Sequence, residues 1–328
     1  MASSRQVLND GKGVVTTTMK ALLMLSYASL QSIDDVLPFY NHLFHGNIPS
    51  VDTLKAAKKR FQSIGVADPL GSVTARQALA MERRLNPFGG ERIKVYQATK
   101  HTSPFVHETV QQMVEDGVTE LYAFPTSPLY SRTGTAAYHQ SVRKALEASG
   151  ANIPVVEINH WHSYPGIAEA ISLRLRTALQ WLSIESRSEA TVLFTAHSQP
   201  GVSEVNNEFI QAFTELAEAV ATRADCGKWL LAYRSAGPAP QKWLRPDVLA
   251  MIEKVAEDGG KAVVVCDLLS LTENVEAIFD CRIHCRMKAE ECGLEFVSTE
   301  FLNDSADYID TLVELIHERM EQSKERKN

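Results

Sequence analysis

The feature that most constrains the fold is an alternation of short apolar runs with longer amphipathic segments along the whole chain. Each apolar run suits a buried strand, and each longer segment has the apolar spacing of a helix. Strands that alternate with helices form parallel sheets covered by helices on both faces. We therefore expect an α/β protein with two doubly wound, Rossmann-like halves, whose parallel four-stranded sheets face each other across a cleft. The expected strands are residues 19–27, 93–98, 120–124, 155–158, 191–196, 228–233, 261–266 and 294–298.

The expected helices begin and end at residues with suitable backbone preferences. Asp34 and Asp35 open the first helix, Pro104 occupies the first turn of another, and Gly150 ends a third in a left-handed conformation. The predicted spans are 34–44, 51–64, 72–86, a helix from 104, 136–149, 166–184, 203–223, 246–258, 272–292 and 305–322.

The charged, serine-containing segment 185–189 is the candidate boundary between the two halves. We expect a flexible leader at residues 1–18, an N-terminal half at 19–185 and a C-terminal half at 186–328. The leader lacks the apolar core of a signal peptide.

Composition narrows the class of protein. The 328 residues are 45% apolar and 22% charged with a net charge of -7, whereas a nucleic-acid-binding domain would show a basic face. No apolar run approaches the roughly 20 residues that span a bilayer. Five cysteines, an odd number, suit a reducing compartment better than a disulfide framework. We expect a cytoplasmic monomer with neither a nucleic-acid partner nor a stable membrane anchor.

A histidine at a strand end is the first candidate for chemistry. His197 follows a buried run, and open α/β sheets bind ligands at the carboxyl ends of their strands. Glu276, Asp280 and His284 recur at i, i+4 and i+8, so they share one face of the predicted helix. A histidine facing this stripe could accept protons and help to bind a divalent metal. The alternatives are a buried, hydrogen-bonded histidine and a solvated helix face.

Several segments, in order along the chain, carry a resemblance to a known family. The most specific are Thr195–Pro200 (TAHSQP) and Glu273–Asp280 (ENVEAIFD). Weaker matches are Asp35–Phe39, Arg60–Gly65, Asp68–Leu70, Pro128–Ser131 and Trp243–Asp247. From about Met19 to about Leu315 the chain resembles the ferrochelatases, enzymes that insert ferrous iron into a porphyrin. It is similar to the monoderm-bacterial type, which acts on coproporphyrin III.

The resemblance implies roles for individual residues. His197 and Glu276 would be the catalytic, metal-handling pair on opposite sides of the porphyrin plane, while Asp280 and His284 would pass metal inward. The porphyrin-binding positions would be Tyr27, Arg60, Phe61, Asp68, Leu129, Tyr130 and Ser131. The implied partners are a porphyrin and Fe²⁺ as substrates in haem biosynthesis, with no further cofactor.

Three cysteines raise the question of an iron–sulfur cluster, because some ferrochelatases carry a [2Fe–2S] centre. Cys281, Cys285 and Cys292 are spread over three turns of one expected helix, too far apart to share a single metal, and a fourth thiolate such as Cys226 or Cys266 would be needed. We expect no cluster and interpret these cysteines as small apolar core residues.

Departures from the family pattern leave alternatives open. Where the family places arginines that would meet porphyrin carboxylates, this chain has Phe44, His45 and Asn47. Lost arginine forks weaken carboxylate recognition. One alternative is a non-catalytic haem- or tetrapyrrole-binding paralogue. Another is a cobalt or nickel chelatase, because imidazole and carboxylate ligands discriminate poorly among these ions.

Overall fold

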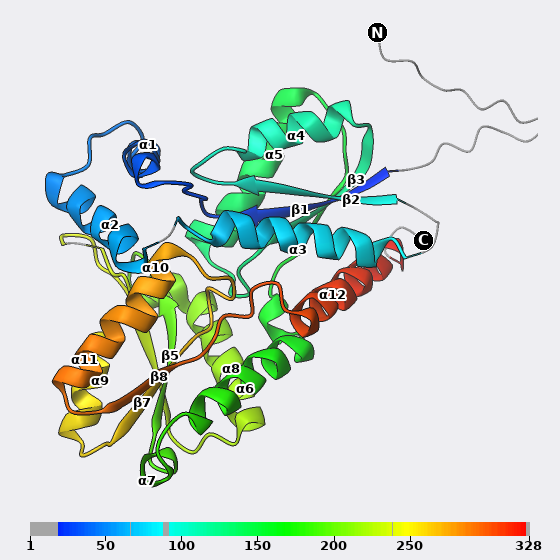
Figure 1. Ribbon diagram of the computed structural model, residues 1–328. Coiled ribbons are helices and arrows are strands. Elements are labelled where there is room, and N and C mark those ends of the chain that lie inside the picture. Colours follow the sequence, from blue (N-terminus) through cyan, green and yellow to red (C-terminus); the bar gives the residue numbers. More distant parts are fainter. Residues whose placement is uncertain (1–18, 66, 88–91, 238, 326–328) are drawn as a thin grey trace, which may run out of the picture.

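Two parallel sheets organise the molecule, as the sequence predicts. The computed structural model describes residues 19–65, 67–87, 92–237 and 239–325 (Figure 1); the expected leader lies outside them. The first sheet has the order β2-β1-β3-β4 and the second β6-β5-β7-β8, with all neighbouring strands parallel. The strands are β1 Met19–Ser26, β2 Arg92–Thr99, β3 Val118–Pro125, β4 Val155–Glu157, β5 Thr191–His197, β6 Trp229–Arg234, β7 Ala262–Asp267 and β8 Glu295–Ser298.

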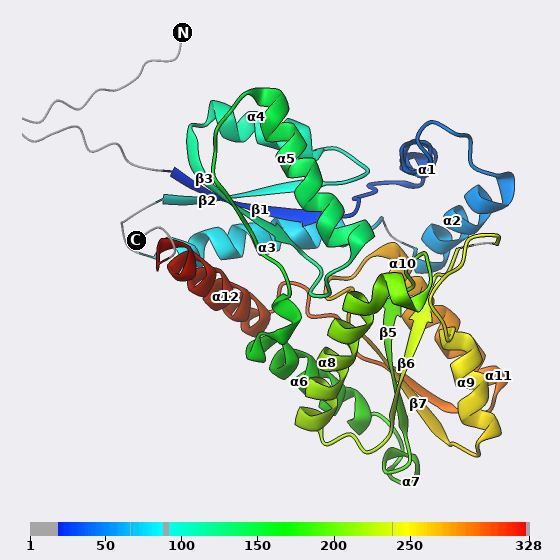
Figure 2. The same cartoon turned by 180° about the vertical axis from the view of Figure 1, so that it is seen from behind.

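Helices cover both faces of each sheet (Figures 1 and 2). On the first sheet, α4 and α5 cover one face, and α3 and α12 cover the other. On the second sheet, α9 and α11 cover one face, and α6 and α8 cover the other. Gly65 and Gly150 end helices in the left-handed conformation, with φ of 69° and 67°. The helices are α1 Val36–Leu43, α2 Val51–Ile64, α3 Leu70–Leu85, α4 Val106–Glu115, α5 Ala137–Ser149, α6 Pro165–Gln180, α7 Ile184–Arg187, α8 Asn207–Ala224, α9 Val248–Glu257, α10 Val275–Ala277, α11 Cys285–Glu291 and α12 Ala306–Glu325.

One hydrophobic core runs through both halves. It joins the inner faces of the two sheets with side chains of α3, α6, α8 and α12. Two further clusters lie on the outer faces, one under α4 and α5 and one under α9 and α11. The predicted boundary at 185–189 overlaps α7, while α6, which precedes it, packs against α8. The placement of the boundary stays a prediction. Among the described residues, no helix combines the length and apolarity needed to cross a bilayer.

The predicted helix bounds differ from the structure at several ends, and two of these differences have a visible cause. The helix expected at 272–292 begins only at Val275, after Asn274 accepts a hydrogen bond from the backbone N–H of Ala277 at 2.9 Å. It then widens into a π-helical turn, Ile278–His284, before continuing as α11. The helix expected from Pro104 begins at Val106 instead, because the preceding residues form a turn closed by Glu108, which accepts a hydrogen bond from the N–H of Phe105 at 2.7 Å.

Buried polar side chains tie the halves together. The Gln77 amide on α3 donates to the Thr272 hydroxyl at 2.8 Å and to the Asn303 carbonyl at 2.6 Å. The Asp68 carboxylate accepts the N–H of Leu70 at 3.2 Å and the N–H of Val275 at 3.1 Å. Asp68 thereby fixes the start of α10 relative to the start of α3.

Replacing Gln77 by Leu should lower the free energy of unfolding. The apolar side chain leaves the buried Thr272 hydroxyl and the half-buried Asn303 carbonyl without their donor, which costs about 1–3 kcal/mol. Denaturant unfolding would measure this loss. The control is Arg76→Gln on the exposed face of the same helix, whose ion pair with Asp304 is worth less than about 1 kcal/mol. Equal losses in the two variants would contradict a special role for Gln77.

Asp68 should make stability fall as the pH rises. Burial raises the pKa of its carboxyl from 3.8 to about 6, against the opposing effect of backbone hydrogen bonds. A raised folded pKa contributes stability that is complete below the unfolded value and lost as the pH rises through the folded one. Asp68→Asn keeps an acceptor but cannot ionise, so it should gain roughly 1–3 kcal/mol relative to the wild type between pH 4.5 and 7.5. Melting curves across this range test the point, and a pH-independent difference would refute it.

Candidate active site

His197 is the last residue of β5, and the loop after it is held firmly. The N–H of Ser198 donates to the Arg234 carbonyl at 2.8 Å, and the Ser198 hydroxyl donates to the Leu244 carbonyl at 2.9 Å. His197 Nδ1 lies 2.7 Å from the Ser198 carbonyl oxygen, which can only accept, so Nδ1 carries a proton. In the neutral ring this leaves the lone pair on Nε2.

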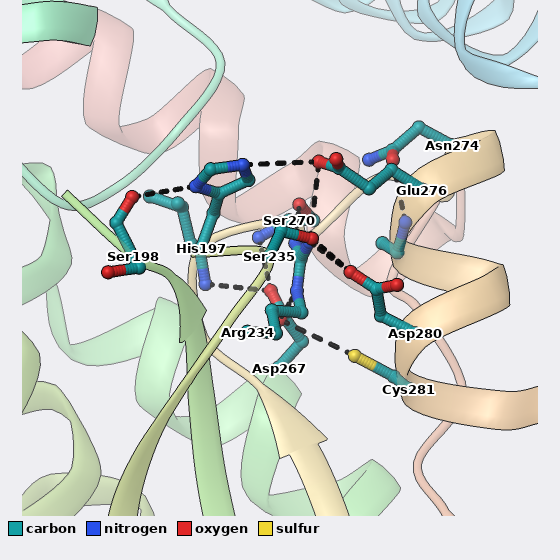
Figure 3. Close-up of polar contacts among 12 residues, drawn as sticks. His197, Ser198, Arg234, Ser235, Asp267, Ser270, Asn274, Glu276, Asp280 and Cys281 are labelled. Atoms are coloured by element: carbon teal, nitrogen blue, oxygen red, sulfur yellow. Dashed lines mark hydrogen bonds and ion pairs between the residues drawn. The ribbon is translucent and has the colours of Figure 1, made fainter. Parts of the chain in front are cut away.

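Glu276 approaches that nitrogen from α10, the short helix that follows β7. Its Oε2 lies 3.4 Å from His197 Nε2 (Figure 3), and its Oε1 lies 3.3 Å from Arg60 Nη1. Arg60 comes from α2, so the carboxylate joins both halves of the molecule. The side chains of His197 and Glu276 are each about one-third exposed, at 31% and 32%. The pair predicted from the sequence is therefore in direct contact and open to solvent.

The contact corrects one expectation. Atoms on opposite faces of a macrocycle would lie about 7 Å apart, twice an optimal non-bonded separation of about 3.5 Å. His197 and Glu276 are 3.4 Å apart, so the structure leaves no room for a macrocycle between these two side chains. Tyr27, from the end of β1, is 44% exposed and packs edge-on against His101 and Phe39.

The surroundings of Glu276 and Tyr27 set the protonation states of these two side chains. Burial raises the pKa of the Glu276 carboxyl, but His197, Arg60 and Arg234 together outweigh it and leave the pKa below its ordinary value. Burial and the Glu276 charge both raise the pKa of the Tyr27 phenol. Glu276 is thus held as an anion, and Tyr27 as a neutral phenol.

A buried ionic network behind Glu276 escaped the sequence analysis. Arg234 ends β6 and Asp267 ends β7, and their side chains are each only 2% exposed with Nε and Oδ2 2.7 Å apart. The Thr195 hydroxyl donates to the same oxygen of Asp267 at 3.0 Å. Although burial lowers the pKa of Arg234, Asp267 raises it well above its ordinary range. Charged residues directly after two of the predicted strands, 228–233 and 261–266, were the available signal.

The other two residues of the predicted stripe, Asp280 and His284, lie in different surroundings. Asp280 is buried, accepts a hydrogen bond from the Ser235 hydroxyl and has Oδ2 3.7 Å from Arg234 Nη1. Burial and the nearby Glu276 charge raise the pKa of Asp280. His284 is exposed and packs against Phe279, with the rings tilted and their centroids 5.6 Å apart. Within the described ranges, no three His, Cys, Asp or Glu side chains are grouped to hold a metal ion.

The expected porphyrin-binding positions also divide. Arg60 and Tyr27 lie beside Glu276, whereas Phe61 is buried in a small cluster under α1 and α2. Leu129 is fully buried in the main core. The core position of Leu129 disagrees with the expected pocket role, because packing encloses the whole side chain.

Two neighbouring positions and Asp68 have specific partners. Tyr130 stacks on His160 with centroids 4.9 Å apart, and the Ser131 hydroxyl accepts from the N–H of Gly134 at 3.0 Å. Asp68 is occupied by the two backbone N–H groups described above.

One cysteine, Cys281, touches the buried network behind Glu276, with its Sγ 3.6 Å from Asp267 Oδ2. All five cysteines are unpaired in the described chain, and Cys281 and Cys285 are buried beneath α9. Burial raises the pKa of both thiols. These two pack as the small apolar residues that the sequence analysis predicts.

A cavity of about 570 Å³ lies beside Trp243. It is lined by the segments 201–204 and 239–245 together with Gly237, and the Trp243 ring lies 6.3 Å from the His197 ring. A Cβ at Gly237 would lie 2.4 Å from Cζ2 of Trp243, so only glycine allows this close approach. The sequence analysis did not predict this cavity.

The fold has solved counterparts. The sirohydrochlorin chelatase of Bacillus subtilis, solved with cobalt, aligns with a TM-score of 0.52 at 9% identity over 94% of this chain and 97% of its own. The same protein with Fe³⁺ gives 0.55 at 10% identity over 94% and 98%. At such low identity these likenesses show the chelatase fold alone.

Sequence relatives go further. A coproporphyrin III ferrochelatase from Geobacillus sp. (strain WCH70) is 28% identical over 91% of this chain and 97% of its own, and one from Oceanobacillus iheyensis is 26% identical over 90% and 95%. A ferrochelatase from Herpetosiphon aurantiacus is 27% identical over 89% and 96%. The family model described as Ferrochelatase matches residues 19–320. The chain therefore belongs to the ferrochelatase family and is a lyase of the porphyrin metal chelatase type.

Proposed function

We propose that this enzyme inserts Fe²⁺ into coproporphyrin III in haem biosynthesis, using His197 as proton acceptor and Glu276 as metal ligand. The observation that carries the proposal is the 3.4 Å contact between His197 Nε2 and Glu276 Oε2. Relatives named coproporphyrin III ferrochelatases support the choice of porphyrin and metal. We retain the expectations that the enzyme is monomeric and acts in the cytoplasm.

The proposed chemistry follows from the tautomer of His197. Insertion must remove two protons from pyrrole nitrogens as the metal enters the ring. With Nδ1–H donated to the Ser198 carbonyl, Nε2 is free to accept the pyrrole protons one after the other, and the first would pass to solvent, to which the His197 side chain is 31% exposed, before the second is taken. The imidazolium formed would be stabilised by the Glu276 carboxylate beside it. Glu276 would offer the incoming Fe²⁺ an oxygen ligand, and iron accepts both carboxylate and imidazole.

Other residues complete the proposed site from the first half. Tyr27 would face the metal across the ring, and Arg60 would bind a porphyrin carboxylate in exchange for its contact with Glu276. Tyr130 and Ser131 are proposed to border the macrocycle, with Asp68 acting through the position of α10. The expected inward path through Asp280 and His284 stays a prediction.

Replacing His197 by Ala should slow insertion by at least about 100-fold, the range expected for loss of a general base. Porphyrin binding should stay largely intact, because the macrocycle is bound by other side chains. Stopped-flow absorbance would give the rate, and fluorescence quenching the porphyrin affinity. His317→Ala, an exposed histidine on α12, is the matched control. Unchanged turnover in His197→Ala would eliminate the mechanism.

Substrate choice is tested by anaerobic incubation with Fe²⁺ and either coproporphyrin III or protoporphyrin IX, followed optically. We expect faster metallation of coproporphyrin III. Parallel reactions with Co²⁺ and Ni²⁺ compare the metals, and preference for one of them would assign a different chelatase. A shifted Soret band on mixing with haem, without turnover of any metal, would identify a tetrapyrrole-binding protein instead.

A further inference from the structure

The buried Arg234 has a free edge that the proposed reaction does not use. Its Nε and Nη2 are held by Asp267 at 2.7 Å and by the Ser270 hydroxyl at 2.8 Å. Its Nη1 has no hydrogen-bond partner, yet lies 3.6 Å from Glu276 Oε2 and 3.7 Å from Asp280 Oδ2. Two of the three guanidinium nitrogens are thus held in place, and the third, Nη1, is directed at two carboxylates (Figure 3).

A gain in folding stability is a weak explanation for burying the Arg234–Asp267 pair. Removing an ion pair from water costs about as much as the attraction between its charges returns, and apolar residues of similar volume often serve as well. The Arg234–Asp267 pair is nevertheless buried, with each side chain 2% exposed. Arginine also cannot lose its proton in a protein. The positive charge behind Glu276 is therefore permanent and fixed in position.

We propose that Arg234 is a counter-charge that closes the space between Glu276 and Asp280 to a divalent metal ion and weakens metal binding at Glu276. The inference rests on the proposed function, in which Glu276 is a metal ligand. A divalent ion between the two carboxylates would lie within a few ångströms of a guanidinium, where repulsion in a poorly solvated site is strong. Metal substrate would reach Glu276 from the side of His197, a route that replaces the inward path expected through Asp280 and His284.

This arrangement has a chemical purpose. A chelatase must release its metal to the porphyrin, so a carboxylate pair that traps the ion would slow the reaction. The Oε2 atom of Glu276 is shared by His197 and Arg234. An incoming cation therefore competes with a charge that is already present. Asp280 is neutralised from the same side and is also bonded to Ser235.

The test is titration of the apo-enzyme with Co²⁺ alone, followed by its visible absorption, with no porphyrin present. The double variant Arg234→Gln/Asp267→Asn removes the buried charge pair without stranding either partner. It should bind Co²⁺ about tenfold more tightly than the wild type. The matched control Arg76→Gln/Asp304→Asn removes an exposed arginine–aspartate pair and should bind Co²⁺ like the wild type. Tighter binding by the first double variant supports the inference, because loss of a scaffold can only weaken binding, whereas unchanged or weaker affinity overturns it.

A second variant has the opposite predicted sign and decides the question if the double variant does not fold. Asp267→Asn alone keeps Arg234 but removes its counter-ion, so more of the positive charge acts on Glu276. Co²⁺ binding should weaken several-fold, and unchanged or tighter binding overturns the inference.

Glu276→Gln separates this inference from the proposed function. If that variant binds Co²⁺ as well as the wild type, Glu276 is no ligand and both proposals fall. If it loses Co²⁺ while the Arg234 double variant matches the wild type, only the counter-charge fails.

Discussion

The site depends on an imidazole nitrogen and a carboxylate oxygen held 3.4 Å apart. Because Nδ1 carries a proton, an uncharged ring directs its Nε2 lone pair at an anion, and two such groups repel unless a cation lies between them. In the structure, Arg60 and Arg234 offset the carboxylate charge from other sides, and under the proposed mechanism a pyrrole proton or the incoming metal ion would lie between the two groups. The two cations that the reaction exchanges thus share one location.

The scaffold keeps this pair together although its members come from different parts of the chain. His197 is fixed by a loop whose backbone is bonded to the segment around Leu244, and Glu276 by a short helix that Asn274 and Asp68 hold at its start. Arg60 approaches from the first half and Arg234 from beneath. Two cations on one carboxylate keep it ionised despite the cost of partial burial. Each supporting group is thus a charge or a backbone donor placed by a different element.

Much of the fold and the central pair could be predicted from the sequence. The eight strands follow from apolar runs, because parallel strands buried on both faces leave a continuous signal. His197 and Glu276 could be found from a strand end and a helical spacing together with the family resemblance. The Arg234–Asp267 pair and the π-helical turn Ile278–His284 could not. They depend on which strands become neighbours and on how the helix backbone hydrogen-bonds, and neither is encoded in local periodicity. Leu129 was misassigned because a motif position does not reveal the direction of a side chain.

The core shared by the two sheets limits how the enzyme can make room for a large, flat substrate. Swinging the halves apart would expose the apolar side chains of α3, α6, α8 and α12 to water, at a cost that grows with every square ångström uncovered. The pair α1 and α2, by contrast, packs on a cluster of only a few residues at the margin of the molecule (Figure 1). Moving α1 and α2 while the rest of the molecule stays rigid would therefore uncover less apolar surface than parting the halves, and it would open space beside Tyr27 and Arg60.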